Sequence, residues 1–332
     1  MAELDSSVAD GIKLERPQSG RRWTILLLKL AISSGLLWLV MHQSSWERAS
    51  ARLNELSIGD VLLAWLPLVA VTCCVGLRWS LIASAVARPV RWLEAWIVSM
   101  IGGALDQVLV MMSGEAYRIW WLRRGAPSLT RAVAGVLLDR VAGVVGIGLL
   151  VLAFFPRFLG LGAGRVLGWV PACLVASVFA GLVALLVMDR LPFGFRRSKW
   201  LARLTELSSS ARKVFLSPAT AIPVLAAAMT VHLGISACIF LIASGLGIRV
   251  GLVETLTVVP TVMLISFLPI SVGGWGVREG SMVIGLGLVG VQSSDALLIS
   301  IIYGLSAAAV GLCGAVFWLF GLPARGPRPA AP

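Results

Sequence analysis

Charged residues are scarce in this chain. Only 13% of its 332 residues are Asp, Glu, Lys or Arg, whereas 58% are hydrophobic. A soluble domain carries roughly 25% charged residues, so no soluble fold could bury this much apolar surface. The apolar residues form continuous runs and do not alternate with polar ones, which excludes a membrane β-barrel. The sequence therefore predicts an all-α polytopic membrane protein.

The sequence also lacks the patterns that metal, cofactor or nucleophilic chemistry needs. It has two histidines, and its five cysteines fall inside apolar runs without metal-ligand spacing. It contains no G-x-x-x-x-G-K-[ST] phosphate-binding loop and no Ser-His-Asp order. We therefore expect no catalytic residue, no metal and no cofactor, and we do not expect an enzyme.

Acidic residues are fewer than basic ones, which gives a formal net charge of +12. A basic excess is often typical of nucleic-acid binding, but no soluble basic domain with interleaved aromatics is present. The Lys and Arg residues lie between apolar runs, as expected for cytoplasmic loops of a membrane protein. We predict no nucleic-acid partner.

Six apolar runs have about the ~20 residues that a helix needs to cross a bilayer. They cover residues 23–41, 58–84, 132–155, 167–188, 221–245 and 295–320. We assign 1–22 to a polar cytoplasmic N-terminus, 23–320 to one transmembrane domain and 321–332 to a disordered tail. Within the basic loop 189–217, residues 200–215 predict an amphipathic helix on the inner leaflet or an ordinary linker helix.

Residues 94–112 are apolar but contain Gly102, Gly103 and Asp106. If this run crossed the membrane, the basic segment 118–131 would lie outside, against the positive-inside rule. If the run enters and returns, that segment and the loop 189–217 both lie inside, together with the N-terminus. We therefore predict a broken or re-entrant element here.

A second break follows the apolar run 252–270, where residues 269–280 read PISVGGWGVREG. Irregular, charged backbone at membrane depth occurs only where it is buried in protein or lines a wet cavity. The run 281–291 that follows is too short to cross. We therefore predict about six full spans and two broken or re-entrant hairpins.

The two halves of the chain share one order of segments: a span, a flawed apolar run, a Ser-Gly motif with arginine, a short helix and a span. MSGEAYR (112–118) stands where ISVGGWGVR (270–278) stands in the second half. Two crossings and one hairpin per half would make the halves antiparallel. This inverted repeat is typical of transporters, although short glycine-rich matches also arise by chance.

The candidate site residues cluster at these two motifs. An arginine fork binds phosphate bidentately, and glycines expose backbone N–H groups that suit an anion. The candidates for substrate binding are Glu115, Arg118, Arg123, Arg124, Asp139, Arg140, Ser271, Gly273, Gly274, Gly276, Arg278 and Glu279.

Structural alternatives exist for several of these residues. The pair Arg278–Glu279 could end one helix and cap another, and Asp139 could simply favour a helix N-terminus. The arginines at 123 and 124 follow two tryptophans and could belong to an interfacial belt.

Two further polar residues lie within apolar runs. Asp106 could be a proton-coupling carboxylate or an arginine partner, and His232 is best interpreted as a residue that hydrogen-bonds between helices.

The motif PISVGGWGVREG and the segment GEAYRIWWLRRGAPSLTRAVAGVLLDRVAG (114–143) resemble the two marked regions of the lysylphosphatidylglycerol synthase transmembrane, or flippase-like, family. Arg78–Trp79 resembles the family's Leu-Arg-Trp at the end of its second span. The resemblance covers residues 23–320. Two departures stand out: Glu115 replaces the usual Asp, and residues 110–112 lack the family's Pro, so the first break is expected to be less sharply bent.

The resemblance implies a multi-pass protein of the bacterial inner membrane that moves, or helps to move, a lipid between leaflets. Full-length relatives add a cytosolic domain that transfers lysine to phosphatidylglycerol. Only a short tail follows residue 320 here, so we do not expect that activity.

The leading hypothesis is a flippase for an anionic lipid or lipid-linked headgroup, with the acyl chains remaining in the bilayer. The alternatives are a membrane glycosyl- or aminoacyl-transferase and a non-transporting accessory subunit of lipid or polysaccharide biosynthesis. A transferase would have to use Asp106, Glu115, Asp139, Glu254 or Glu279, and no donor motif accompanies them. Expected partners are membrane lipids, with biosynthetic enzymes and a second copy of the chain as further candidates.

Overall fold

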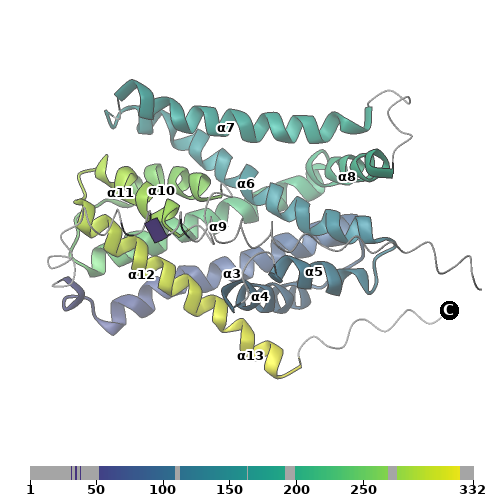
Figure 1. The fold of residues 1–332 in the computed structure, drawn as a ribbon, viewed down its shortest axis with the longest axis horizontal. Helices are drawn as coiled ribbons and strands as arrows, with labels where there is room; N and C mark the ends of the chain where they lie inside the picture. The colour runs from purple at the N-terminus through teal and green to yellow at the C-terminus, as the bar shows by residue number, and fades with distance from the viewer. Residues whose placement is uncertain are drawn as a thin grey trace, which may run out of the picture.

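The computed structural model describes residues 52–108, 113–162, 164–190, 199–267 and 275–321, together with a few isolated positions between 31 and 38. In these ranges the chain is helical and contains no strand (Figure 1). The polar N-terminus, the first predicted span and the tail from residue 322 lie outside them.

The described helices include long apolar helices and, between them, pairs of shorter helices. Their bounds are α3 Ile58–Val86, α4 Trp92–Val108, α5 Ser113–Arg123, α6 Leu129–Leu159, α7 Gly164–Val187, α8 Lys199–Phe215, α9 Pro218–Gly245, α10 Leu252–Ser266, α11 Val277–Gly287, α12 Ser293–Leu312 and α13 Gly314–Leu319, with a 3-10 turn at Met188–Arg190. Five stretches are long and apolar enough to cross a membrane: Ile58–Val86, Leu129–Leu159, Gly168–Arg190, Pro218–Gly245 and Ser293–Leu319. These confirm the polytopic all-α class and five of the predicted spans.

The long helices begin at local sequence signals. Ser57 caps α3: its Oγ accepts the Asp60 N–H at 3.1 Å, and Asp60 Oδ2 accepts the Ser57 N–H at 3.1 Å. Ser128 caps α6 by accepting the Arg131 N–H at 3.1 Å. Helix α6 therefore starts at Leu129 rather than at the predicted residue 132.

The two halves of the chain repeat the same helices. A shift of 160 residues, which carries Arg118 onto Arg278, also carries Ile58 onto Pro218 and Trp92 onto Leu252, the first residues of α3 and α9 and of α4 and α10. The same shift carries the end of α6 onto the end of α13, whereas α11 and α12 each begin four residues later than it places them. The packing repeats as well, because α4 packs on α12 as α10 packs on α6.

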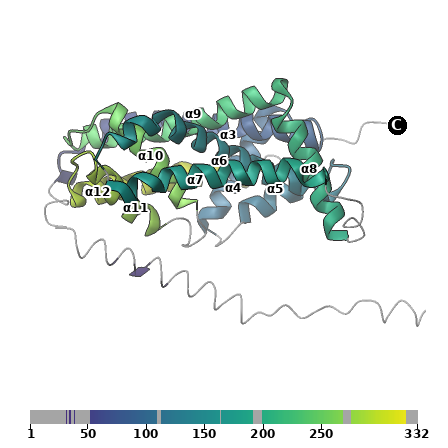
Figure 2. The same ribbon diagram turned by 90° about the horizontal axis from the view of Figure 1, so that it is seen from above.

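The first helices of the two halves run antiparallel along each other. Asp60, near the start of α3, packs against Gly245 at the end of α9. Val71 packs against Gly234, because its Cγ2 lies 2.6 Å from the position that a Cβ on Gly234 would take. Ile82 shares a buried cluster with Val224. Figures 1 and 2 show α3 and α9 lying side by side. The repeat is therefore inverted, as the sequence motifs predict.

Each half contains one hairpin of short helices, α4–α5 and α10–α11 (Figure 1). Helices α5 and α11 have 11 residues each, which is about 16 Å at 1.5 Å per residue, half of a ~30 Å hydrocarbon core. Helix α11 starts at Val277, earlier than the predicted residue 281. Both hairpins therefore turn back within the length of the long helices.

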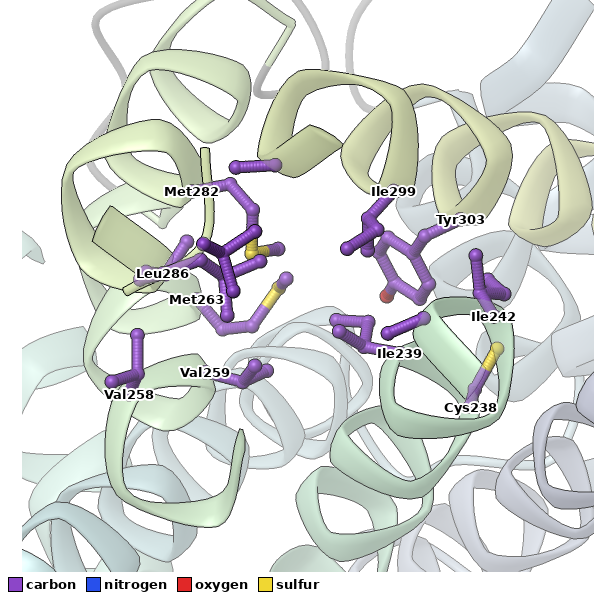
Figure 3. Packing of buried hydrophobic residues seen from close by; sticks show 14 of the residues in the cluster. Cys238, Ile239, Ile242, Val258, Val259, Met263, Met282, Leu286, Ile299 and Tyr303 are labelled. Carbon is purple, nitrogen blue, oxygen red and sulfur yellow. The ribbon is translucent and has the colours of Figure 1, made fainter. Parts of the chain in front are cut away.

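The largest described hydrophobic core lies around the second hairpin. Side chains of α9, α10, α11 and α12 converge there, as Figure 3 shows for Ile239, Val259, Met263, Met282 and Ile299. All of these side chains are buried. This core holds α10 and α11 against the two flanking spans.

The two ends of the bundle differ in charge. At one end the turns 86–92 and 123–129 lie together with α8. The basic residues of this end are Arg88, Arg91, Arg123, Arg124, Arg131, Arg203, Arg212 and Lys213. At the other end, Arg52 pairs with Asp295 at 3.1 Å and Arg157 with Glu254 at 3.5 Å. Figure 2 shows α8 at the basic end, running across the long helices, so the predicted amphipathic helix at 200–215 is confirmed as a helix.

The inverted repeat predicts which loops share a side of the membrane. In a cysteine-free background, Pro127→Cys and Ser209→Cys should react with an impermeant thiol reagent from one side, and Ser293→Cys from the other. All three positions are exposed. Labelling of Pro127→Cys and Ser293→Cys from the same side would contradict the hairpin arrangement of α4 and α5.

Candidate functional site

The first half holds a fully buried carboxylate between two arginines. Asp139 Oδ1 accepts from Arg78 Nε at 2.7 Å, and its Oδ2 accepts from Arg118 Nη2 at 2.8 Å. The Asp139 side chain is 2% exposed. The three residues come from α6, α3 and α5, so this ion pair joins the short helix of the hairpin to both flanking spans.

Aromatic rings and glycine shape the space around these arginines. The Arg118 guanidinium lies over the ring of Trp79, 4.4 Å from its centroid, and Trp79 packs on Trp121 at 5.9 Å. Both tryptophans are buried, and a desolvated cation over an aromatic face is favourable. A Cβ on Gly143 would lie 3.2 Å from Arg78 Nη1, so the glycine makes room for that arginine.

Glu115 and Arg140 form a second ion pair beside the first. Glu115 is buried, whereas the Arg140 side chain is 48% exposed. Glu115 Oε2 and Arg118 Nε are buried and have no hydrogen-bond partner in the part of the chain that the structure describes. Glu115 Oε2 can therefore accept, and Arg118 Nε donate, one further hydrogen bond.

Asp106 has a structural role. Its Oδ1 accepts the Gly114 N–H at 2.8 Å and the Ser113 hydroxyl at 3.4 Å. It thus satisfies a free donor at the start of α5. Neither sequence-based interpretation, an arginine partner or a proton-coupling group, is needed to explain this geometry.

The second half places Arg278 and Glu279 in the first turn of α11. Arg278 Nε and Nη2 donate to Glu279 Oε1 at 3.0 and 2.5 Å. Glu279 is fully buried, and its Oε2 accepts the N–H of Gly276 at 2.6 Å. Position 276 requires a glycine, because its φ of +86° is one that residues with a side chain rarely adopt. The capping interpretation is therefore correct for Glu279, which also holds the arginine.

Helix α12 forms the other wall of this second group. The Arg278 guanidinium lies 4.6 Å from the ring centroid of Trp275 and 5.6 Å from that of Tyr303. A Cβ on Gly304 would overlap its Nη2. Ser300 adds a hydroxyl that donates to Glu279 Oε1 at 3.4 Å.

The two arginine groups occupy equivalent places in the repeat but are neutralised differently. The 160-residue shift that relates Arg118 to Arg278 places Ile299 opposite Asp139 and Ile119 opposite Glu279. The first arginine thus draws its carboxylate from a neighbouring span, and the second draws it from its own helix. The first group also contains Arg78 and Arg140, whereas Arg278 is the arginine of the second group within the described residues.

The structure brings together seven of the predicted site residues in these two groups: Glu115, Arg118, Asp139, Arg140, Gly276, Arg278 and Glu279. It leaves Arg123 and Arg124 exposed at the end of α5, where Arg124 stacks on Trp120 at 3.9 Å. The interfacial-belt interpretation describes these two better. Ser271, Gly273 and Gly274 lie outside the described residues.

The proposed role of Asp139 at a helix start is wrong, because α6 begins ten residues earlier. Sequence reasoning also missed the ring of Tyr303 and did not place Arg78 among the site residues, although Arg78–Trp79 forms part of the family resemblance. The missed signal was an arginine within an otherwise apolar run. His232 matches its interpretation: its Nε2 lies 3.2 Å from the carbonyl oxygen of Gly143 on α6.

Replacing Asp139 with Asn should strongly destabilise the protein, because two buried arginines would lose their counter-charge. We expect a loss of about 3–5 kcal/mol in the free energy of unfolding, measured by denaturant titration in mixed micelles. The control is Glu206→Gln, which breaks the half-exposed pair with Arg131 at 3.5 Å and should cost about 0–1 kcal/mol. Equal losses for the two variants would contradict the role assigned to Asp139.

Comparison with known proteins agrees with this architecture. No curated protein sequence matches the chain. A family model described as the lysylphosphatidylglycerol synthase TM region matches residues 26–315, which include both hairpins and both arginine groups. The chain is therefore a member of the lysylphosphatidylglycerol synthase transmembrane-region family.

Proposed function

We propose that this protein moves an anionic lipid, or a lipid-linked anionic headgroup, between the leaflets of a bacterial inner membrane. The observation that carries the proposal is the pair of buried arginines, Arg118 and Arg278, on α5 and α11, the short helices of the two inverted hairpins. Intramembrane charge is expensive and marks substrate pathways. Inverted repeats with broken helices place such sites near the bilayer midplane.

The charge balance favours an anionic substrate. Arg78 and Arg118 share the single carboxylate of Asp139, so these three residues together carry one more positive than negative charge, and the neighbouring pair Glu115–Arg140 adds no net charge. The unpartnered Arg118 Nε is a further donor. A phosphate would supply the missing charge and accept from a guanidinium fork bidentately.

The charge difference between the two ends supports an orientation. Cytoplasmic loops collect Lys and Arg, so the end that carries α8 and the turns 86–92 and 123–129 would face the cytoplasm. The first predicted span would then start from a cytoplasmic N-terminus. In this orientation α4–α5 and α10–α11 are re-entrant hairpins that enter from opposite sides, and α8 lies along the inner leaflet.

We also propose that the protein has no catalytic activity of its own. The buried carboxylates Asp139 and Glu279 accept hydrogen bonds from arginines, and Asp106 and Glu279 also cap helices. A general acid or base must instead reach its substrate within hydrogen-bond distance. Membrane lipids are the proposed partners, and association with lipid- or glycan-synthesis enzymes or with a second copy would add to this role.

Leaflet exchange in proteoliposomes tests the proposal. Purified protein in phosphatidylglycerol-containing vesicles should accelerate exchange of a fluorescent phosphatidylglycerol, followed by quenching of the outer leaflet. Arg278→Ala should slow this exchange about 10–100-fold, because it removes a charge-assisted contact with the phosphate. Arg278→Lys keeps the positive charge but loses the bidentate guanidinium, so its exchange rate should fall between those of the wild type and Arg278→Ala.

Gly304→Ala is a second variant that leaves every charge in place. Its new methyl group would displace the Arg278 guanidinium, so exchange should slow as well. Arg123→Ala, at an exposed arginine outside both groups, is the matched control and should exchange like the wild type. Wild-type exchange at the protein-free rate, or unchanged exchange by Arg278→Ala in folded protein, would refute the proposal.

A further inference from the structure

An apolar cavity of about 190 Å³ lies where the two halves of the repeat meet. Its walls come from α3, α4, α9 and α12, and it is partly open to the outside of the bundle. The α12 residues in its wall, from Tyr303 to Gly311, follow helical spacing along one face and extend over about 12 Å. The cavity is therefore an elongated seam between helices.

The equivalent seam in the other half is filled. The 160-residue shift relates α3, α4 and α12 to α9, α10 and α6. On the hollow side the lining includes Ser99, Gly103, Ala307 and Gly311. Their counterparts are Val259, Met263, Ile147 and Val151, all buried in the main hydrophobic core. Figure 3 shows how Val259 and Met263 fill their side.

Small residues on one side of the repeat thus create a space that larger residues close on the other. Packing voids of this size are costly, and an apolar cavity of about 150 Å³ stays free of water and takes up apolar ligands. Thr72, one of the polar side chains in the wall, is already satisfied: its Oγ1 accepts from Trp96 Nε1 at 3.0 Å and donates to the Val69 carbonyl at 2.8 Å. The natural occupant is therefore a hydrocarbon chain.

The position of the cavity indicates which chain. Helix α4 enters from the basic end, and Ser99 lies seven residues after its start, whereas Tyr303 lies deeper, beside Arg278. The buried Ser99 Oγ has no hydrogen-bond partner within the described residues. An ester carbonyl of a phospholipid would give this hydroxyl an acceptor, with the chain extending from there toward Tyr303.

We propose that this cavity binds one acyl chain of a phospholipid from the leaflet at the basic end of the bundle. The sequence suggests that the chains remain in bulk lipid, and here one of them is held by the protein. Binding follows from the packing alone. The inference rests on the proposed function only where the bound lipid is taken to be the transported one.

Photocrosslinking tests the binding directly. The full chain is reconstituted in phosphatidylcholine vesicles with phosphatidylglycerol that carries a diazirine in one acyl chain, irradiated, and mapped by mass spectrometry. We expect peptides of α3 and α12 that line the cavity to be labelled more strongly than those of α7, which faces lipid at Trp169 and Val183.

The variant Ser99→Val/Ala307→Ile fills the cavity with the side chains that the repeat itself uses. Labelling of the lining should fall to the level of α7, whereas the unfolding temperature should stay equal or rise, because a void is filled. Ala180→Ile makes the same exchange as Ala307→Ile at an exposed position on α7 and should leave labelling unchanged.

Two results would overturn the inference: wild-type labelling of the lining no stronger than that of α7, or equal labelling of the lining in the filled variant. Leaflet exchange measured on the same vesicles separates the two proposals. Exchange without labelling of the lining would leave the transport proposal standing and remove this one. Labelling of the lining without exchange would leave the acyl-chain proposal standing and remove the transport proposal.

Discussion

Lipid cannot hydrate a charged side chain or the unpaired N–H groups at a helix start, and the structure meets this constraint at the starts of α5 and α11. Asp106 caps the start of α5, and Glu279 caps the start of α11. The arginine that follows each break has a buried carboxylate within 3 Å. Interruptions that would be costly in lipid are thus stabilised inside the protein, and they can be retained for a functional purpose.

The same solution appears twice, in opposite directions, because the two halves are related by an inverted repeat. The differences between the halves are therefore informative. One arginine shares a carboxylate with a second arginine from a neighbouring span, whereas the other is held within its own helix. One seam between the helices is filled by Val259 and Met263, and its counterpart is hollow at Ser99 and Gly103. Two departures from symmetry, one in charge and one in volume, distinguish two otherwise similar halves.

Hydropathy alone predicted most of the fold. The predicted span 58–84 corresponds to α3 at 58–86, and most of the flawed run 94–112 lies in α4, which ends at Val108 before α5 begins at Ser113. These predictions succeed because length and apolar continuity are local properties of the chain. The positive-inside rule added the hairpin, since a full crossing would have placed the arginines after residue 118 on the wrong side.

The pairing of the charges could not be predicted in the same way. Asp139 accepts from residues 61 and 21 positions away, and no local pattern indicates such partners. Asp139 was assigned to a helix start, although it lies in the interior of α6, ten residues after Leu129. The cavity was also hidden, because it depends on volumes at equivalent positions that only the 160-residue shift relates.

Membrane depth at the two breaks is the most direct test of this account. Spin labels at Ala116 and Val277, in the first turns of α5 and α11, can be placed by their accessibility to oxygen and to a water-soluble nickel chelate. Both labels should lie near the bilayer centre, although their helices start from opposite ends of the bundle. A label at headgroup depth in either position would contradict the arrangement of two inverted hairpins with arginines at the midplane.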